Sequence, residues 1–123
     1  MSVDYDKLRM DARNRYSRTA DDGSRVTLSL EGDNLVVQTP LRLDYLVTDA
    51  ARRDAKTFSG KFQGIEVRFN QTEYLDSSGL GLLLALRALL PEGAKRPRLT
   101  GIRSEGVRLP LHHSKLDLLF DIQ

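Results

Sequence analysis

One segment, residues 65–90, constrains the fold of this chain more than any other. Residues 65–75 have the pattern of a β-strand, and residues 80–90 form a nearly all-apolar run of helical length. Residues 76–79, Asp-Ser-Ser-Gly, connect the two. A helix that is apolar almost all round is usually covered on more than one side. We therefore expect a sheet with a buried helix packed on it, and serine hydroxyls at the N-terminus of that helix.

The rest of the chain alternates between strand and helix periodicity. The predicted strands are residues 25–31, 35–39, 65–69 and 98–102, and the predicted helices are residues 43–57, residues 78–90 and a third helix that begins near Ser104. The turn residues between the first two strands predict a hairpin. The order β-β-α-β-α-β-α predicts a single α/β domain, with a mixed sheet of about four strands and helices packed on it. Residues 116–122 are apolar enough to pack on its core.

The first predicted helix is amphipathic. Its predicted apolar side consists of the residues that follow helical spacing, which are Leu43, Leu46, Val47, Ala50 and Phe58. Asp44 is placed to cap its start, and Ser59-Gly60 is a reasonable end. Pro110 lies inside the third predicted helix, so we expect that helix to be kinked or shortened.

Residues 1–24 form a predicted N-terminal extension, and residues 25–123 form the predicted domain. The extension is polar, and a weak helical stripe runs through it, consisting of Tyr5, Leu8, Ala12 and Tyr16. Two interpretations stay open for it. It is either a flexible or lightly docked segment, or a helix that binds a partner or a second copy of the chain.

The composition excludes several classes of protein. There is no Cys, which rules out disulfides, thiolate metal sites and Cys nucleophiles. The first residues lack the pattern of a signal peptide, and the longest apolar run is too short to span a bilayer. We therefore expect a cytoplasmic protein with no direct membrane insertion. A net charge of +2, with Lys and Arg spread along the chain, argues against nucleic acid as a partner.

Within this order of elements, three segments resemble a known family. Residues 75–84 read Leu-Asp-Ser-Ser-Gly-Leu-Gly-Leu-Leu-Leu, residues 99–102 read Leu-Thr-Gly-Ile, and residues 116–122 read Leu-Asp-Leu-Leu-Phe-Asp-Ile. Together they make residues 25–122 similar to the STAS domain, and most similar to the bacterial anti-sigma factor antagonists. Residues 41–44 resemble the Gly-x-Leu-Asp segment of that family. Here Leu41 replaces the Gly, and the N-terminal extension is longer than the minimal domain carries.

The resemblance implies a regulatory protein-binding module that is not an enzyme. In that family the unmodified antagonist binds an anti-sigma factor that is also a serine kinase. The kinase phosphorylates the serine directly after the motif Asp, which ends binding, and a PP2C-type phosphatase restores it. The corresponding serine here is Ser77, with Ser78 as the alternative. The implied partner-binding residues are Asp76, Ser77, Ser78, Gly79, Leu80, Gly81 and Asp44. We predict no catalytic residue, no cofactor and no metal, and the oligomeric state stays open.

The same residues allow other interpretations. Asp76 or Ser77 can be a helix cap, worth about 1 kcal/mol, which is compatible with phosphorylation. Asp44 can be a cap or part of the partner surface. Gly79 and Gly81 remove Cβ bulk, which lets another backbone approach closely.

The competing functions differ in what they require of the sequence. A serine hydrolase needs an elbow of the Gly-x-Ser-x-Gly type, but residue 75 is Leu, and only His112 and His113 could act as the base. These two adjacent residues diverge by about 100° on a helix, away from a shared metal ion. The remaining functional alternative is a STAS accessory domain that regulates a transporter or another membrane complex, or a STAS module that binds a nucleotide.

Overall fold

The structure is a computed structural model that describes residues 24–123. The predicted N-terminal extension lies outside the described residues, except for Ser24. The strands are β1 (Thr27–Glu31), β2 (Asn34–Gln38), β3 (Arg42–Leu43), β4 (Gly64–Arg68), β5 (Tyr74–Leu75), β6 (Arg98–Thr100) and β7 (Asp121–Ile122). The helices are α2 (Tyr45–Lys56), α3 (Ser77–Arg87), α4 (Glu105–His113) and the short 3₁₀ helix η2 (Leu116–Leu118).

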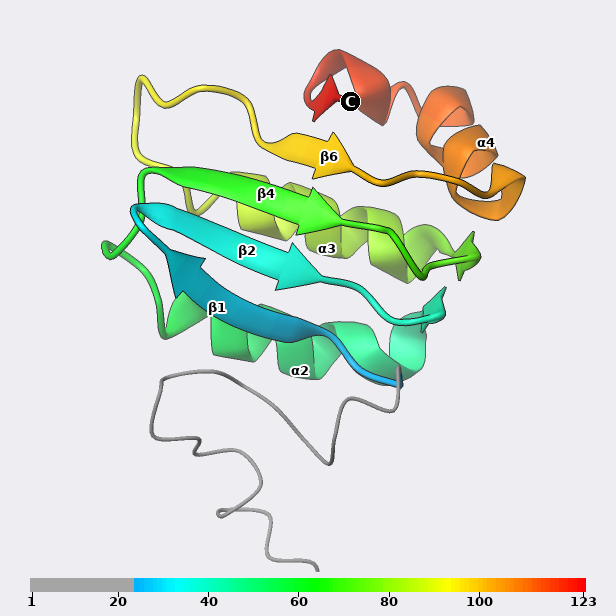
Figure 1. Cartoon of the computed structure of the whole chain (residues 1–123), viewed down its shortest axis with the longest axis horizontal. Helices are drawn as coiled ribbons and strands as arrows, with labels where there is room; N and C mark the ends of the chain where they lie inside the picture. The colour runs from blue at the N-terminus through cyan, green and yellow to red at the C-terminus, as the bar shows by residue number, and fades with distance from the viewer. Residues whose placement is uncertain (1–23) are drawn as a thin grey trace, which may run out of the picture.

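The main sheet has five strands in the order β1-β2-β4-β6-β7 (Figure 1). The hairpin between β1 and β2 is antiparallel, and the other pairs are parallel. The predicted α/β fold with a mixed sheet is therefore confirmed. The prediction of about four strands missed β7, and it also missed a separate parallel pair formed by β3 and β5. Residues 65–75, which have the pattern of one strand, instead divide into β4 and β5 in two different sheets. Each of these three strands has two residues, which is too short for an alternating pattern to be visible.

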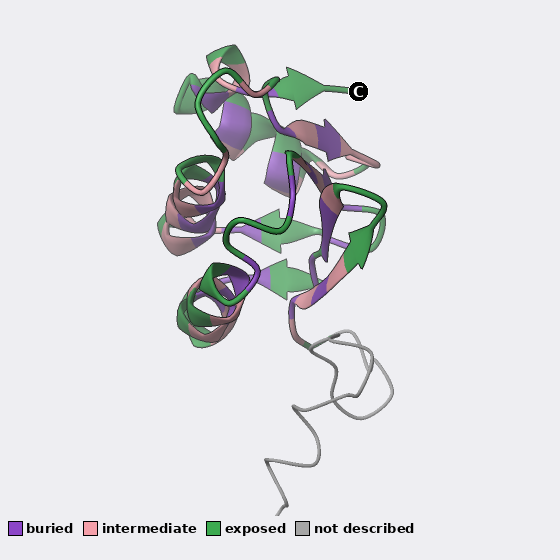
Figure 2. Ribbon diagram, turned by 90° about the vertical axis from the view of Figure 1, so that its left-hand side faces the viewer, coloured by how far each residue is buried: buried purple, intermediate pink, exposed green. Residues whose placement is uncertain are grey.

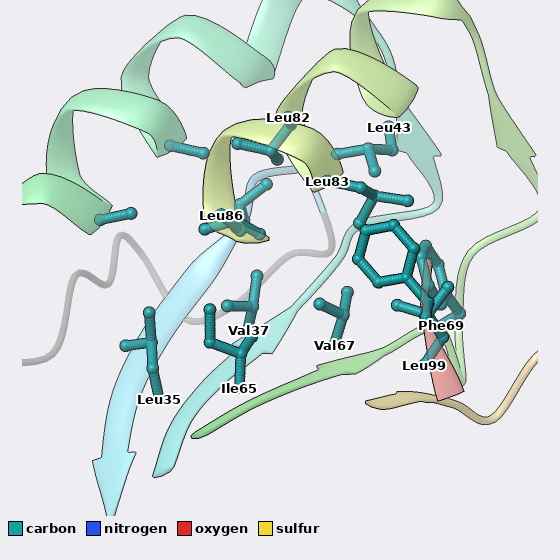
Figure 3. Close-up of a cluster of buried hydrophobic side chains, with 14 of the residues drawn as sticks. Leu35, Val37, Leu43, Ile65, Val67, Phe69, Leu82, Leu83, Leu86 and Leu99 are labelled. Carbon is teal, nitrogen blue, oxygen red and sulfur yellow. The ribbon is translucent and has the colours of Figure 1, made fainter. Parts of the chain in front are cut away.

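The alternation along the strands places one set of side chains on the covered face of the sheet. Helices α2 and α3 lie side by side on that face (Figures 1 and 2). The core between them and the sheet includes Val37, Ile65 and Val67 from the strands and Leu82, Leu83 and Leu86 from α3, all fully or almost fully buried (Figure 3). The prediction that the leucines of residues 80–90 belong to the core holds for most of them, but Leu84 is exposed.

The opposite face of the sheet carries charged side chains around Glu66. The carboxylate of Glu66 lies 3.2 Å from Nε of Arg68 and 3.5 Å from Nη2 of Arg98, and it accepts a 2.9 Å hydrogen bond from the hydroxyl of Thr100. The hydrogen bond from Arg68 is the main reason that the pKa of Glu66 lies below its usual value, although burial acts in the opposite direction. These contacts span β4 and β6, so they join the strands on the side that α2 and α3 do not cover.

The buried side of helix α2 agrees with the predicted one only in part: Val47 packs against the core, and Leu43 and Phe58, which flank the helix, are buried. Asp44 caps it as expected, and Leu43 belongs to β3 rather than to the helix. The buried helical residues are Thr48, Ala51 and Ala55, whereas Leu46 is 74% exposed. The spacing i, i+3, i+7 of the buried residues defines the true inner side, and Leu46 is about 200° away from Thr48 on a helical wheel. The assignment of Leu46 to the apolar core side was therefore wrong.

The third predicted helix is α4, and Pro110 lies inside it without ending it. Ser104 caps its start by accepting the N–H of Gly106 at 3.0 Å. Pro110 has no N–H to donate to the carbonyl of Gly106, but the helix continues to His113. The helix has 9 residues, against 12 in α2 and 11 in α3. Pro110 therefore does not end the helix, and Leu111 directly after it packs in the core.

Candidate functional site

The candidate site lies at the end of the molecule where β3 and β5 meet their helices. The two strands pair in parallel, with Arg42 opposite Tyr74 and Leu43 opposite Leu75. The next residue after each pair is an aspartate, Asp44 in one segment and Asp76 in the other. Because both aspartates start a helix, the N-termini of α2 and α3 lie at the same end of the molecule, where the helix dipoles are positive.

The loops that lead into these strands are fixed by hydrogen bonds. The hydroxyls of Thr39 and Thr72 are buried and bonded to each other, and the N–H of Glu73 donates to the carbonyl of Leu41 at 2.9 Å. The hydroxyl of Ser104, at the start of α4, donates to the carbonyl of Glu73 at 2.9 Å. These contacts connect the segments before β3, β5 and α4, so the site is held by three parts of the chain.

Asp76 organises the first turn of α3. One carboxylate oxygen accepts the backbone N–H groups of Ser78 and Gly79, at 2.9 and 3.1 Å, and the hydroxyl of Ser78 at 2.6 Å. Burial raises the pKa of Asp76, but the bonds from Ser78 and Gly79, together with the N–H of Tyr45 in α2, leave that pKa below its usual value. Asp76 is therefore a charged N-cap, and the interpretation of Asp76 as a cap is confirmed.

The two serines of the turn differ in what their hydroxyls can do. Ser78 is half-buried, and its hydroxyl is held by Asp76. Ser77 is the first residue of α3 and is exposed, and within residues 24–123 its hydroxyl has no hydrogen-bond partner. A group that must meet an incoming partner needs this accessibility. The geometry therefore distinguishes Ser77 from Ser78 where the sequence left both as candidates.

Gly79 and Gly81 have different surroundings. Gly79 is buried, and a Cβ on it would lie 2.8 Å from the carbonyl oxygen of Leu43 and 3.2 Å from Cβ of Leu75. A Cβ on Gly81 would meet only the tip of Arg52, at 3.8 Å. The sequence-based explanation, that both glycines admit the backbone of another molecule, is thus incomplete for Gly79, because the chain's own strand β3 occupies that space. Leu80 between them is half-buried.

Asp44 is the second aspartate of the site. Its carboxylate accepts the N–H of Leu46 at 3.1 Å and lies 3.6 Å from Nε of Arg42. The interpretation as a cap is confirmed, and a role in partner binding stays a prediction. The guanidinium of Arg42 also lies 4.3 Å from the centre of the Tyr74 ring, in a cation–π contact.

Exposed apolar side chains lie beside the site, and the sequence pattern did not predict them. Leu41, Tyr45 and Leu46 are 49%, 69% and 74% exposed. We refer to these three residues as the α2 patch. A helical wheel centred on Thr48, Ala51 and Ala55 would have placed Leu46 on the outer side of α2, but Tyr45 lies only about 60° from Thr48 on that wheel. The signal for Leu46 was therefore present in the sequence, whereas the exposure of Tyr45 was not.

Other candidate features lie away from this site. His112 and His113 are in the last turn of α4, whereas the first turn of that helix contacts the site through Ser104. The described residues contain no group of three or more potential metal ligands. No helix in residues 24–123 has both the length and the apolar character needed to cross a bilayer. A hollow of about 680 Å³, lined in part by Asn34, Gly64 and Arg98, lies at the opposite ends of the strands.

Comparisons with known proteins identify the fold. No protein-family model matches the sequence, and no curated protein matches it. Solved structures do match. The anti-sigma factor antagonist SpoIIAA in its unphosphorylated form is 22% identical, with a TM-score of 0.63 over 80% of this chain and 86% of SpoIIAA. The phosphorylated form, described as a Bacillus cell fate determinant, is 24% identical, with a TM-score of 0.62 over 80% of this chain and 90% of SpoIIAA. An anti-sigma factor antagonist from Mycobacterium paratuberculosis is 19% identical, with a TM-score of 0.68 over 79% and 82% of the two chains.

These matches show that the described residues form an α/β domain with a mixed sheet of known type. The described part of the chain has the fold of the anti-sigma factor antagonists, which is the STAS fold.

Proposed function

We propose that this protein is a cytoplasmic anti-sigma factor antagonist, a regulatory protein-binding module. In the proposed cycle it binds an anti-sigma factor that is also a serine kinase. Phosphorylation of Ser77 ends that binding, and a PP2C-type phosphatase restores it. The observation that carries the proposal is the hydroxyl of Ser77, which is exposed at the start of a fixed helix in a STAS fold and has no hydrogen-bond partner among residues 24–123.

The hydrogen bonds of the turn support Ser77 as the acceptor. The hydroxyl of Ser78 would have to leave Asp76 before it could react, because it donates to that carboxylate at 2.6 Å. The hydroxyl of Ser77 has no such bond to break. Asp76 also fixes the backbone of Ser78 and Gly79, so a kinase would meet Ser77 in a defined position.

The same bonds favour a phosphate that faces solvent. Asp76 already accepts the N–H groups of Ser78 and Gly79, so a phosphate on Ser77 could not use those donors without displacing a carboxylate. The phosphate would add a charge of about −1.5 to −2 beside Asp76, while the helix N-terminus would favour that charge by roughly 0.3–1 kcal/mol. The folded domain would tolerate the group, and a partner would have to desolvate it.

A small energetic penalty at the interface is enough for a switch. A loss of about 1.4 kcal/mol weakens binding tenfold. The partner surface would contain Ser77, Ser78, Leu80 and Gly81, with Asp76 and Asp44 holding the two helix starts. Buried Gly79 would contribute through packing. The α2 patch would add apolar contact area beside Ser77.

The test is phosphorylation of the full chain by a serine switch kinase from the same genome, with ATP and Mg²⁺, followed by mass spectrometry. We expect one phosphate on Ser77, which is lost in Ser77→Ala and kept in the matched control Ser78→Ala. Binding of the kinase to Ser77→Asp should be at least about tenfold weaker than to wild type, while Ser77→Ala should still bind. Phosphate on Ser78 alone, or unchanged binding by Ser77→Asp, would contradict the proposal.

A further inference from the structure

The α2 patch consists of large apolar side chains that the rest of the described residues leaves exposed. Single exposed apolar side chains are normal on protein surfaces, but neighbouring ones mark interaction sites. Tyr45 and Leu46 are consecutive in the first turn of α2, and Leu41 lies just before β3. All three are among the large apolar residues most exposed in the described part of the chain. Their position beside Asp44 and Asp76 raises the question of what covers them.

The path of the chain places Ser24, where the described residues begin, at this corner. Strand β1 is antiparallel to β2, and its residue Thr27 pairs with Gln38 at the end of β2. Residue 24 therefore lies at the same end of the sheet as residues 39–46. In Figure 1 the start of β1 lies close to the first turn of α2, and Figure 2 shows the two in adjacent layers.

The sequence of residues 1–23 fits the patch in reach, chemistry and charge. Its stripe of Tyr5, Leu8, Ala12 and Tyr16 covers 12 residues, which would be about 18 Å long as a helix. Seven residues remain between the stripe and Ser24, and they can span up to roughly 25 Å. Residues 1–23 contain five Asp and five Lys or Arg, so the segment carries no net charge that would repel the basic domain.

We propose that residues 1–23 dock on the α2 patch through the stripe of Tyr5, Leu8, Ala12 and Tyr16, and thereby cover the surface next to Ser77. The consequence for regulation rests on the proposed function, because a covered patch would compete with the kinase partner. If the segment covers the patch about nine-tenths of the time, its removal from the patch should strengthen partner binding about tenfold. The docking itself requires no partner and is tested without one.

The absence of Cys allows a clean test in the full chain. A nitroxide spin label on Asn14→Cys would lie on the side of the helical wheel opposite the stripe. The amide signals of residues 44–47 are then compared in ¹H–¹⁵N spectra between the oxidised and reduced label. We expect the oxidised label to remove most of the signal intensity at these residues, and much less at the far end of α4.

A tethered segment could broaden nearby signals without docking, so the decisive comparison is between variants. Tyr45→Ser combined with Leu46→Ser should restore the signals of the neighbouring residues 44, 47 and 48. The matched control, Leu109→Ser combined with Leu118→Ser, changes two exposed apolar residues at α4 and η2 and should leave the broadening unchanged. Equal broadening in wild type and the Tyr45/Leu46 variant would overturn the proposal.

A mixed sample identifies the occupant. Spin-labelled chain without ¹⁵N is combined with ¹⁵N-labelled chain without the spin label. Broadening of residues 44–47 in this sample would mean that a second copy covers the patch, which also overturns the proposal. Neither result bears on phosphorylation of Ser77. Conversely, a failure of the kinase experiment would leave the docking result valid.

Discussion

The starts of α2 and α3 follow the same design and present different chemistry. Each helix follows a two-residue strand, and the two strands pair with each other. Each begins with a capping aspartate that follows a buried leucine. After the aspartate the two segments diverge, since α2 continues with Tyr45-Leu46 and α3 continues with Ser77-Ser78.

The two helix starts differ in how many hydrogen bonds the capping aspartate accepts. Asp44 accepts one backbone N–H and lies near Arg42, whereas Asp76 accepts two backbone N–H groups and the hydroxyl of Ser78. The start of α3 is thus fixed more completely, and yet it leaves the hydroxyl of Ser77 free. The start of α2 leaves apolar surface free. The same strand–aspartate–helix arrangement therefore exposes a hydroxyl at the start of α3 and an apolar contact surface at the start of α2.

The largest effect on stability should come from Gly79→Ala. Gly79 is the third residue after Asp76, and the residue at the same offset in α2 is Val47, so only α3 needs a glycine there. The added methyl would lie 2.8 Å from a backbone oxygen of β3, and such overpacking costs about 1–3 kcal/mol. We expect a loss of about 2–3 kcal/mol in the free energy of unfolding, measured by urea denaturation.

The free energy of unfolding of Gly79→Ala tests whether the start of α3 packs against the Leu43 carbonyl of β3 as closely as the structure shows. A stability equal to that of wild type would mean that the helix start can shift away from the Leu43 carbonyl at no cost. Circular dichroism at 222 nm before denaturation serves as the control, because it shows whether the variant keeps its helices.

The second largest effect on stability is expected from removing the capping aspartates, and it should differ between Asp76 and Asp44. Loss of an N-cap usually costs about 0.5–2 kcal/mol. Because Asp76 accepts three hydrogen bonds from its own turn and Asp44 accepts one, we expect Asp76→Ala to cost about 2 kcal/mol and Asp44→Ala about 1 kcal/mol. Both values come from urea denaturation at neutral pH. Equal costs would contradict the stronger organisation that we assign to the start of α3.

The dependence on pH sharpens the same comparison. The pKa of Asp76 is lower in the folded protein than its usual value, so the charged form contributes stability above the unfolded pKa of about 3.9. That contribution is lost as the pH falls through the lower, folded pKa. Asp76→Asn keeps a capping side chain but cannot titrate. The stability difference between wild type and Asp76→Asn should therefore shrink as the pH falls from about 5 to about 2.

The sequence predicted the fold well because its signals are local and repeated. Alternation in residues 65–69 and the apolar run of residues 80–90 follow directly from which side chains face the core. The capping roles of Asp44 and Asp76 were also visible, because each precedes a helical run, and Ser104 marked the start of the third helix. Pairing of β3 with β5 was not predictable, since two residues carry no period and the pair depends on long-range packing.

The residues of the site could be predicted from the sequence, but which serine hydroxyl is bonded and which is exposed could not. Ser77 and Ser78 have the same chemistry and are adjacent in sequence, so only the direction of each hydroxyl separates them. The bond between Ser78 and Asp76 supplies that information. The exposed apolar surface at Tyr45 and Leu46 was not predicted, because Leu46 fits the helical spacing of the residues that were assigned to the core side. That error arose because Leu43 and Phe58, which flank α2 and are buried, were counted as part of the helix.

The smallest effect on stability is expected for Gly81→Ala, which should raise the free energy of unfolding, whereas the other variants lower it. Gly81 lies five residues after Asp76, and Asp49 occupies that offset in α2, so the offset itself does not demand a glycine. A methyl at Gly81 would lie 3.8 Å from Nη2 of Arg52, which is ordinary contact, and Ala is better than Gly inside a helix by up to about 1 kcal/mol. We expect the variant to be more stable by about 0.5–1 kcal/mol.

If Gly81 allows the partner to approach closely, the same variant should bind the switch kinase more weakly despite its higher stability. Unchanged binding together with higher stability would leave Gly81 without a role at the interface, and lower stability would contradict the open space beside it.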